Sequence, residues 1–254
     1  MKRGQITVYM IVGVVILILV VSLLYYRGSI LKEISSEKQI EISSVPEQFK
    51  EIQTQIKDCT DKFVLDSIYS LSDHSGYLDW TNTKTYSFLG FDLPYAFYGK
   101  ENRLLDIKSM EIQLSKNILK NLPNDCEIQS GNIEIVFGNI QASSKISETS
   151  VIVGIIWIIS LQKGSIRTSI DKINLNYPLR VGKLRDSANE MINIQKSYAP
   201  GICTSCLAEI GQKNKVFVET IPRGNNIVFI LTDLEQNEEN PLKFRFIGDY
   251  GGYK

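Results

Sequence analysis

The chain has only one histidine, His74, and this scarcity removes most arrangements used for acid–base catalysis. A histidine-based triad would have to use His74, yet no G-x-S-x-G elbow and no glycine-rich phosphate loop occurs in the sequence. His74 stands at the predicted end of a helix, where an imidazole interacts favourably with the negative end of the helix dipole. Asp73 and Asp79 could join it around a cation, but their spacing is a weak signal. We therefore predict no catalytic residue, no cofactor and no metal site, so the chain is not expected to be an enzyme.

An excess of basic charge is also missing. Lys and Arg together number 28, as do Asp and Glu, and setting aside Lys2 and Arg3 leaves 26 basic against 28 acidic residues. A nucleic-acid-binding protein would be expected to show a strongly basic face, so we predict no nucleic-acid partner. The chain also has no N-x-S/T sequon, which argues against sequon-directed glycosylation.

One uncharged apolar run does occur, over residues 6–26. Its 21 residues would cover roughly the 30 Å of a bilayer's hydrocarbon layer as a helix. A cleaved signal peptide would have a shorter apolar stretch followed by small residues, whereas this run ends in Tyr25-Tyr-Arg27. Lys2 and Arg3 precede the run, so positive-inside logic places residues 1–5 in the cytoplasm. The sequence predicts a single-pass membrane protein with the bilayer as a partner and its C-terminal domain outside the cytoplasm.

The four cysteines, Cys59, Cys126, Cys203 and Cys206, all follow this run, in a compartment where disulfides persist. Three pairings are possible, and we favour Cys59 with Cys126 and Cys203 with Cys206, because the second pair forms a C-x-x-C. A redox role for the C-x-x-C is a weaker interpretation, since no thioredoxin-like βαβ pattern surrounds it. Zinc binding is weaker still, because a four-cysteine site normally shows two such motifs.

The rest of the chain predicts an α+β domain over 45–254, preceded by a stalk or helical extension over 27–44 and with a sub-boundary near 200. Apolar residues at helical spacing predict helices over 46–75, 106–123 with Asp106 as cap, 184–198 and 203–213. Strand patterns cover 133–140, 151–161, 166–177, 216–221, 227–232 and 243–247, with Ala142-Ser-Ser read as the first turn. Residues 151–161 are almost entirely apolar, which indicates a buried strand. Because turns separate neighbouring strands, we expect mainly antiparallel sheets.

Eight aromatic residues gather between positions 77 and 98, a segment that we expect to form short strands and turns. Core packing is the favoured interpretation of these rings. A surface for a protein, glycan or small solute is the alternative, because Tyr and Trp combine flat apolar faces with a polar tip. The residues that would form it are Tyr77, Trp80, Tyr86, Tyr95 and Tyr98.

The N-terminus, Lys2-Arg-Gly-Gln-Ile-Thr-Val-Tyr9 leading into the apolar run, resembles the class III signal peptides of archaeal type IV pilin-like proteins over about 25 residues. The resemblance implies cleavage after Gly4 by a prepilin peptidase, which would leave Gln5 first and Thr7 third. The family's usual glutamate at the fifth mature position is replaced by Tyr9, so the resemblance implies membrane insertion but not filament assembly. The whole chain also resembles uncharacterised single-pass archaeal proteins.

These observations predict a membrane-anchored structural or interaction protein of the cell surface, with protein partners there and room for a homo-oligomer. A tethered module that binds a glycan or solute through residues 77–98 is the runner-up, and an extracytoplasmic enzyme comes third.

The processing prediction is tested by mass spectrometry of the N-terminus of the native protein. A chain that starts at Gln5 would establish cleavage after Gly4. A chain that starts at Met1 would contradict it.

Overall fold

The computed structural model describes residues 38–98, 101–198, 201–236 and 240–251. The predicted membrane helix at 6–26 and the processing site at Gly4 and Gln5 lie outside these residues. Within them, no helix has the length and apolar character needed to cross a membrane. Gln39–Lys254 form one compact unit of helices and sheets, which confirms the predicted α+β class.

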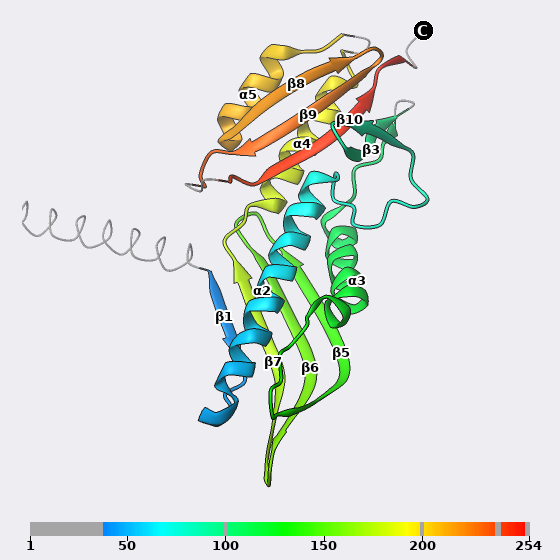
Figure 1. Ribbon diagram of the computed structural model, residues 1–254. Coiled ribbons are helices and arrows are strands. Elements are labelled where there is room, and N and C mark those ends of the chain that lie inside the picture. The colour runs from blue at the N-terminus through cyan, green and yellow to red at the C-terminus, as the bar shows by residue number, and fades with distance from the viewer. Residues whose placement is uncertain (1–37, 99–100, 199–200, 237–239, 252–254) are drawn as a thin grey trace, which may run out of the picture. The chain divides into compact units, whose positions relative to one another are not determined.

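The first sheet, which we call the N-terminal sheet, is four-stranded and antiparallel in the order β1-β7-β6-β5, with β5, β6 and β7 as a meander (Figure 1). Its strands are β1 (Gln39–Ile42), β7 (Ile166–Tyr177), β6 (Val151–Lys163) and β5 (Glu134–Ile146). In β6 every second side chain is buried, including Ile155, Trp157 and Ile159. Successive side chains of a strand point to opposite faces, so these residues define one inner face.

Two long helices cover that inner face. They are α2 (Lys50–Asp73), which follows the 3-10 turn η1 (Glu47–Phe49), and α3 (Ile107–Asp125). The predicted stripes are confirmed, with Ile52, Ile56 and Ile68 of α2 at most 2% exposed. The predicted cap is confirmed as well, because the Asp106 side chain accepts a hydrogen bond from the Ser109 amide at 2.7 Å.

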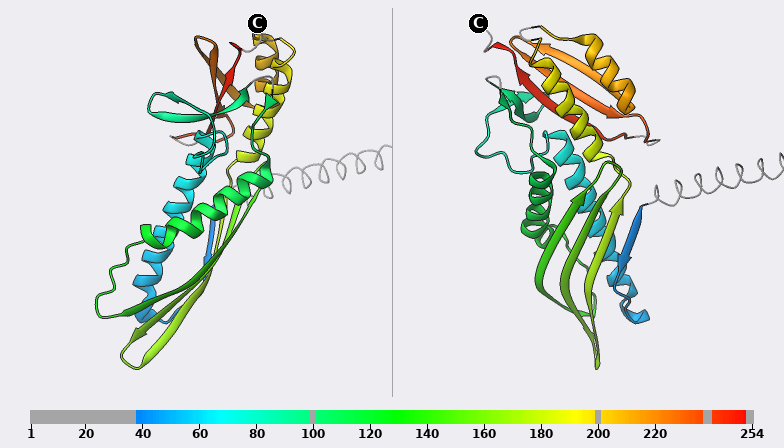
Figure 2. Two further views of the ribbon diagram at one scale, coloured as in Figure 1. Left: turned by 90° about the vertical axis from the view of Figure 1, so that its right-hand side faces the viewer. Right: turned by 180° about the vertical axis from the view of Figure 1, so that it is seen from behind.

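The second sheet, the C-terminal sheet, has the order β2-β3-β10-β9-β8, with β4 (Glu101–Asn102) on β3. Its other strands are β2 (Thr85–Phe88), β3 (Phe91–Tyr98), β8 (Val216–Arg223), β9 (Asn226–Asp233) and β10 (Lys243–Asp249). Helices α4 (Val181–Gln195) and α5 (Thr204–Asn214) lie on one side of it, and the β2–β3 hairpin curls over the other (Figure 2). All pairings are antiparallel except β3 with β10, so the mainly antiparallel prediction holds.

The structure corrects three local predictions. Residues 39–42, assigned to a stalk or helical extension, form β1, because Ile40 and Ile42 alternate with polar residues and pack on the core beside β7. Ala142-Ser-Ser is not a turn but lies within β5. The chain turns instead at 147–150, where the Ser147 hydroxyl oxygen accepts from the Ser150 amide at 3.0 Å.

The third correction concerns β6, which was expected to be buried throughout. Its inner residues are buried, but Ile152, Ile156 and Ile158 are about half exposed, at 47, 51 and 49%. No helix among the described residues covers the outer face to which they belong, as the rear view in Figure 2 shows.

The first turn of α4 joins the two sheets at Gly182. A Cβ atom added to Gly182 would lie 2.4 Å from the Ser147 carbonyl oxygen in the turn between β5 and β6. Because the obstacle is a backbone carbonyl, neither α4 nor the β5–β6 turn can move away without disturbing its own backbone contacts. The absence of a side chain therefore lets α4 begin directly against the end of the N-terminal sheet.

We expect Gly182→Ala to reduce the free energy of unfolding by about 2 kcal/mol, the usual cost of overpacking a close contact. Thermal unfolding of the full chain in detergent measures this loss. Gly201→Ala is the control, because its added Cβ would meet only the Tyr198 carbonyl oxygen, at 3.2 Å, and Gly201 lies outside the β5–β6 turn. Equal stability of the two variants would contradict the close packing at Gly182.

Candidate functional site

The five aromatic residues of the predicted surface do not share one exposed face, because some are buried in the core and others are partly exposed. Tyr77 and Tyr95 are buried, at 9 and 6% exposed. Their hydroxyls donate to the Arg103 carbonyl oxygen at 3.1 Å and to Asn226 Oδ1 at 3.2 Å. Burial raises the pKa of both phenols, so both remain neutral donors. These two tyrosines therefore act as structural hydrogen-bond donors.

The other predicted rings are partly exposed but already have partners. Tyr98 packs edge-on against Tyr95 at 5.3 Å between ring centroids, and the Lys84 ammonium lies 4.0 Å from the centre of the Tyr98 ring. Tyr86 borders the small core that Phe88 forms with its neighbours on β3, β9 and β10. The structure thus joins Tyr95 with Tyr98, while a glycan-binding role for the segment stays a prediction.

Trp80 also has a partner, because it stacks on His74 at the end of α2. Their ring centroids are 4.5 Å apart and the planes differ by 11°. His74 Nδ1 lies 2.7 Å from the Ser70 carbonyl oxygen, an acceptor in the last turn of α2. This geometry fits the structural interpretation of His74 as a helix-end residue.

A groove of about 560 Å³ lies beside His74, between the end of α2 and strand β10. Asp73 and Arg245 form an ion pair in its wall, and the Arg245 guanidinium lies 4.8 Å from the centre of the Phe91 ring. Burial lowers the pKa of Arg245. Because the most buried charges of the groove neutralise each other, we find no reactive arrangement in it.

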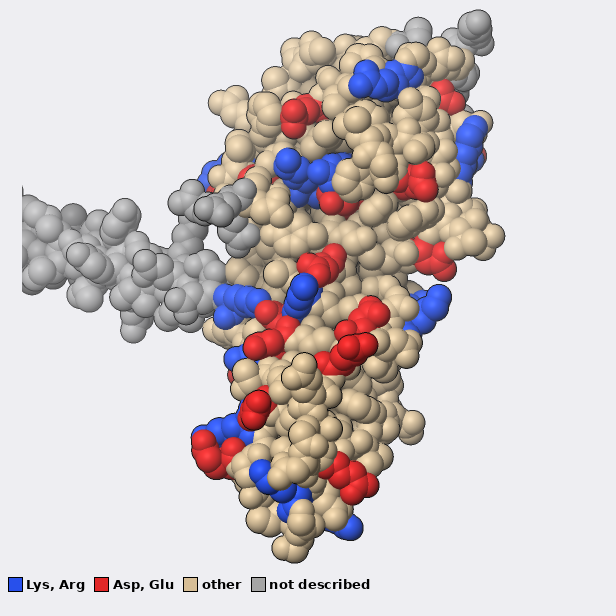
Figure 3. Space-filling view, viewed as in Figure 1, with Lys and Arg blue, Asp and Glu red and all other residues tan. Residues whose placement is uncertain are grey.

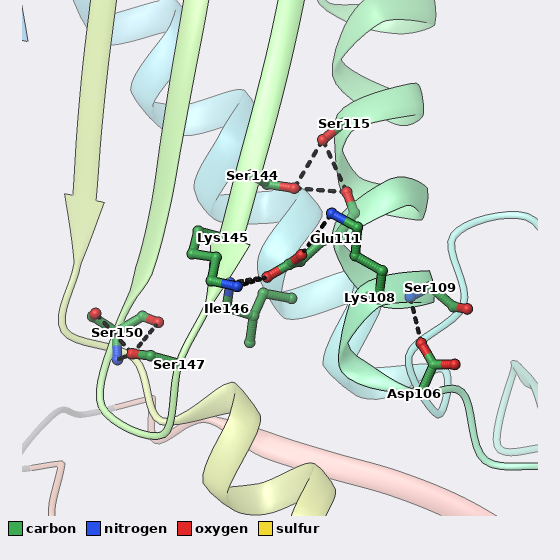
Figure 4. A network of polar contacts seen from close by, with 10 residues as sticks. All are labelled: Asp106, Lys108, Ser109, Glu111, Ser115, Ser144, Lys145, Ile146, Ser147 and Ser150. Carbon is green, nitrogen blue, oxygen red and sulfur yellow. Dashed lines mark hydrogen bonds and ion pairs between the residues drawn. The ribbon is translucent and has the colours of Figure 1, made fainter.

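The charged network in Figure 4 joins α3 to the end of β5 around Glu111, whose side chain is 3% exposed. Its Oε1 accepts from the Ile146 amide at 3.0 Å and lies 3.4 Å from the Lys145 ammonium. The Lys108 ammonium lies 3.3 Å from Oε2. Burial raises the pKa of Glu111, but the Ile146 amide and the two lysines together lower it below its ordinary value. The carboxylate is fully partnered, so the network is structural.

Both predicted disulfides are confirmed. Cys59 of α2 pairs with Cys126 at the end of α3, and Cys203 pairs with Cys206 in the first turn of α5, with Cα–Cα distances of 5.7 and 5.3 Å. The first bridge ties together the two helices that cover the N-terminal sheet. No free cysteine remains.

The outer face of the N-terminal sheet is the feature that sequence reasoning missed. Its central strand presents a row of half-exposed isoleucines, Ile152, Ile156 and Ile158, interrupted by Gly154. At Gly154 the face is hollowed by about 250 Å³, between Ser143 of β5 and Asn174 of β7. An apolar centre with a polar rim is typical of a protein–protein contact surface.

Charge does not mark another site on the opposite side. Lys and Arg side chains are interspersed with Asp and Glu on the face drawn in Figure 3. Among the described residues, no group of three or more His, Cys, Asp and Glu side chains is placed to hold a metal ion.

Comparisons with known proteins add no relative. No protein-family model matches the chain, and neither a curated protein nor a solved structure matches it.

The Glu111 network yields a pH-dependent prediction. We expect Glu111→Gln to lower the free energy of unfolding at pH 7 by about 2 kcal/mol, since it removes charge-assisted hydrogen bonds from a buried acceptor. A carboxyl whose pKa is lowered on folding stabilises the protein above its unfolded pKa, and that contribution is lost as pH falls through the folded pKa. The difference in free energy of unfolding between variant and wild type should therefore become smaller as the pH falls below 4.5, the ordinary pKa of a glutamate carboxyl.

Denaturant unfolding at pH 7 and pH 3 measures both effects. Glu101→Gln is the control, because Glu101 forms only an exposed ion pair with Arg103, which is worth well under 1 kcal/mol. A Glu111→Gln deficit that does not change with pH would contradict the assigned role of the carboxylate.

Proposed function

We propose that this chain is a membrane-anchored structural protein of the cell surface, whose extracytoplasmic domain binds a second copy through the outer face of the N-terminal sheet. The anchor is the apolar segment 6–26, with the N-terminus in the cytoplasm. Support for the location comes from that segment, from the pilin-like residues before it, and from the pairing of all four cysteines, which is typical of oxidising compartments.

The interaction is carried by one observation, the half-exposed Ile156 beside the hollow at Gly154. The two residues lie on the same face of β6 and are two positions apart, about 7 Å along the strand. In a two-fold contact both copies use the same surface, so an insertion that one copy makes is also made by the other. A two-fold axis between Gly154 and Ile156 would place each isoleucine in the hollow of the other copy.

The rim of the hollow suits a second copy equally well. Gln141 and Ser143 lie on the β5 side, and Asn174 and the charged Lys172 lie on the β7 side. Amide and hydroxyl groups both donate and accept, so they can pair with copies of themselves. The predicted anchor would also hold the copies in one membrane with the same orientation.

We expect Ile156→Lys to raise the dimer dissociation constant by about 30-fold or more, the effect of losing a central interface residue. Ile156 points away from the core, so the fold should persist. Sedimentation velocity of the detergent-solubilised full chain, over a dilution series, measures the association.

The matched control is Ile166→Lys. Ile166 is similarly exposed, at 46%, but lies at the tip of the β6–β7 hairpin, away from Gly154. We expect it to leave the dimer unchanged. A monomeric wild type, or an Ile156→Lys variant that dimerises normally, would contradict the proposed contact, whereas recovery of the chain by aqueous washing without detergent would contradict the anchor.

A further inference from the structure

The Cys203–Cys206 disulfide closes the first turn of α5, and its two sulfurs have different surroundings. Cys203 is the N-cap residue of α5. Its sulfur accepts a hydrogen bond from the Cys206 amide at 3.3 Å and lies 3.5 Å from the Ser205 hydroxyl. A sulfur in a disulfide has no proton, so the hydroxyl is the donor. Two donors and the positive end of the helix dipole therefore converge on the Cys203 sulfur.

This convergence makes Cys203 the better leaving group. When a disulfide is opened by an incoming thiolate, the expelled sulfur leaves as a thiolate, and it leaves faster the better its charge is stabilised. Donors at a helix N-terminus provide that stabilisation, as they do for reactive cysteines in general. When the disulfide opens, the negative charge is therefore favoured on the Cys203 sulfur over the Cys206 sulfur.

Access favours the same direction. Cys203 is 9% exposed, whereas Cys206 is partly exposed on the surface of α5, beside the exposed Ser205. An incoming thiolate therefore reaches the Cys206 sulfur more easily than the Cys203 sulfur. The reachable sulfur and the sulfur suited to leave are two different atoms, as a directed exchange requires.

The backbone at Cys203 is fixed without help from the disulfide. Gln195, which is 1% exposed, donates to the Cys203 carbonyl oxygen at 3.2 Å and accepts from the Cys203 amide at 3.0 Å. This pair of bonds anchors the start of α5 to the end of α4. Opening the disulfide would therefore leave the two sulfurs in place to close again.

The Cys59–Cys126 bridge acts as an internal control, because Cys59 is partly exposed, as Cys206 is, but its sulfur has different surroundings. Cys126 is buried, at 6% exposed. The Cys59 sulfur faces the Asp125 carbonyl oxygen at 3.8 Å, and an acceptor at that position opposes a negative charge on the sulfur. We therefore expect this bridge to open more slowly, because charge on the Cys59 sulfur is disfavoured and not because the sulfur is out of reach.

We propose that Cys203–Cys206 is a thiol–disulfide exchange site that accepts electrons from protein dithiols. A thiolate of the partner attacks the Cys206 sulfur, the Cys203–Cys206 bond breaks, and its electron pair stays on Cys203. The second thiolate of the partner then attacks the partner's first sulfur, which is bound to Cys206 in the mixed disulfide. This step expels the Cys206 thiolate. The partner leaves with a disulfide, having lost two electrons, and Cys203 and Cys206 take up two protons as a dithiol.

The first test is the order in which the two disulfides open. The detergent-solubilised full chain is treated with limiting dithiothreitol, quenched by alkylation over time, and mapped by peptide mass spectrometry. We expect Cys203–Cys206 to open about tenfold faster or more than Cys59–Cys126, with the far-UV circular dichroism unchanged. Ser205→Ala should slow the first opening severalfold without affecting the second. Equal rates, or earlier opening of Cys59–Cys126, would overturn the proposal.

The second test is the direction of attack. In Cys203→Ser the thiol at Cys206 should form a mixed disulfide with oxidised glutathione, and in Cys206→Ser the buried Cys203 should react about tenfold more slowly. Cys203→Ser also removes the resolving sulfur, so its mixed disulfide should accumulate. Faster reaction at Cys203 would overturn the assignment of Cys206 as the attacked sulfur. Neither test depends on the dimer. A negative result in either test would therefore overturn the exchange site and leave the proposed function untouched.

Discussion

The burial of one side of α2 is the constraint on which the rest of the domain depends. Phe49, Ile52 and Ile56 at its beginning, and Ile68 and Leu71 near its end, are all at most 2% exposed. The helix contacts strands of both sheets, β1 and β7 in the first and β10 in the second. Each such side chain contributes about 1.5–3 kcal/mol when fully buried. The apolar stripe of α2, together with the start of α4 at Gly182, therefore holds together two sheets that share no strand.

Much of this arrangement can be read from local patterns, because helices and hairpins are local structures. The stripe of α2, the Asp106 cap and the strands of the meander all follow from residue periodicity. The register of β1 could not be read in this way, since four residues after a long polar segment give a weak alternation, and their partner β7 lies more than 120 residues away. The Ala142-Ser-Ser segment misled for the opposite reason. Its small polar residues are typical of turns, but here Ser144 donates to the Glu111 carbonyl oxygen at 2.6 Å from within a strand.

The two surface features on which the proposals rest were harder to predict than the fold. The composition of 151–161 indicates a strand, but an apolar residue on the outer side looks the same in sequence as one on the inner side. Only the position of α2 and α3 on one face shows that Ile156 is uncovered. The cysteine pairing was predictable from spacing, whereas the unequal surroundings of the Cys203 and Cys206 sulfurs depend on Gln195 and on the start of α5, which are tertiary features.

The described domain therefore combines a rigid interior with two exposed features of different chemistry. The Cys59–Cys126 bridge and the Glu111 network hold α2 and α3 to each other and to the N-terminal sheet. Both helices lie on the inner face of that sheet, so the outer face with Ile156 and the hollow at Gly154 stays uncovered. Helix α5 packs on the C-terminal sheet. Opening of the Cys203–Cys206 disulfide therefore need not disturb the outer face of the N-terminal sheet.

The parallel pairing of β3 with β10 has a consequence for how the chain acquires its shape. Tyr95 is opposite Ile247, so a strand formed early in synthesis finds its main partner only when the last few residues have been made. Contacts so distant along the chain are slow to form, because a long loop must close first. The aromatic hairpin of residues 85–98 must wait, with its apolar rings uncovered, until β10 has been made. A nascent chain halted before residue 243 would consequently be a target for chaperones and proteases rather than a shorter version of the same fold.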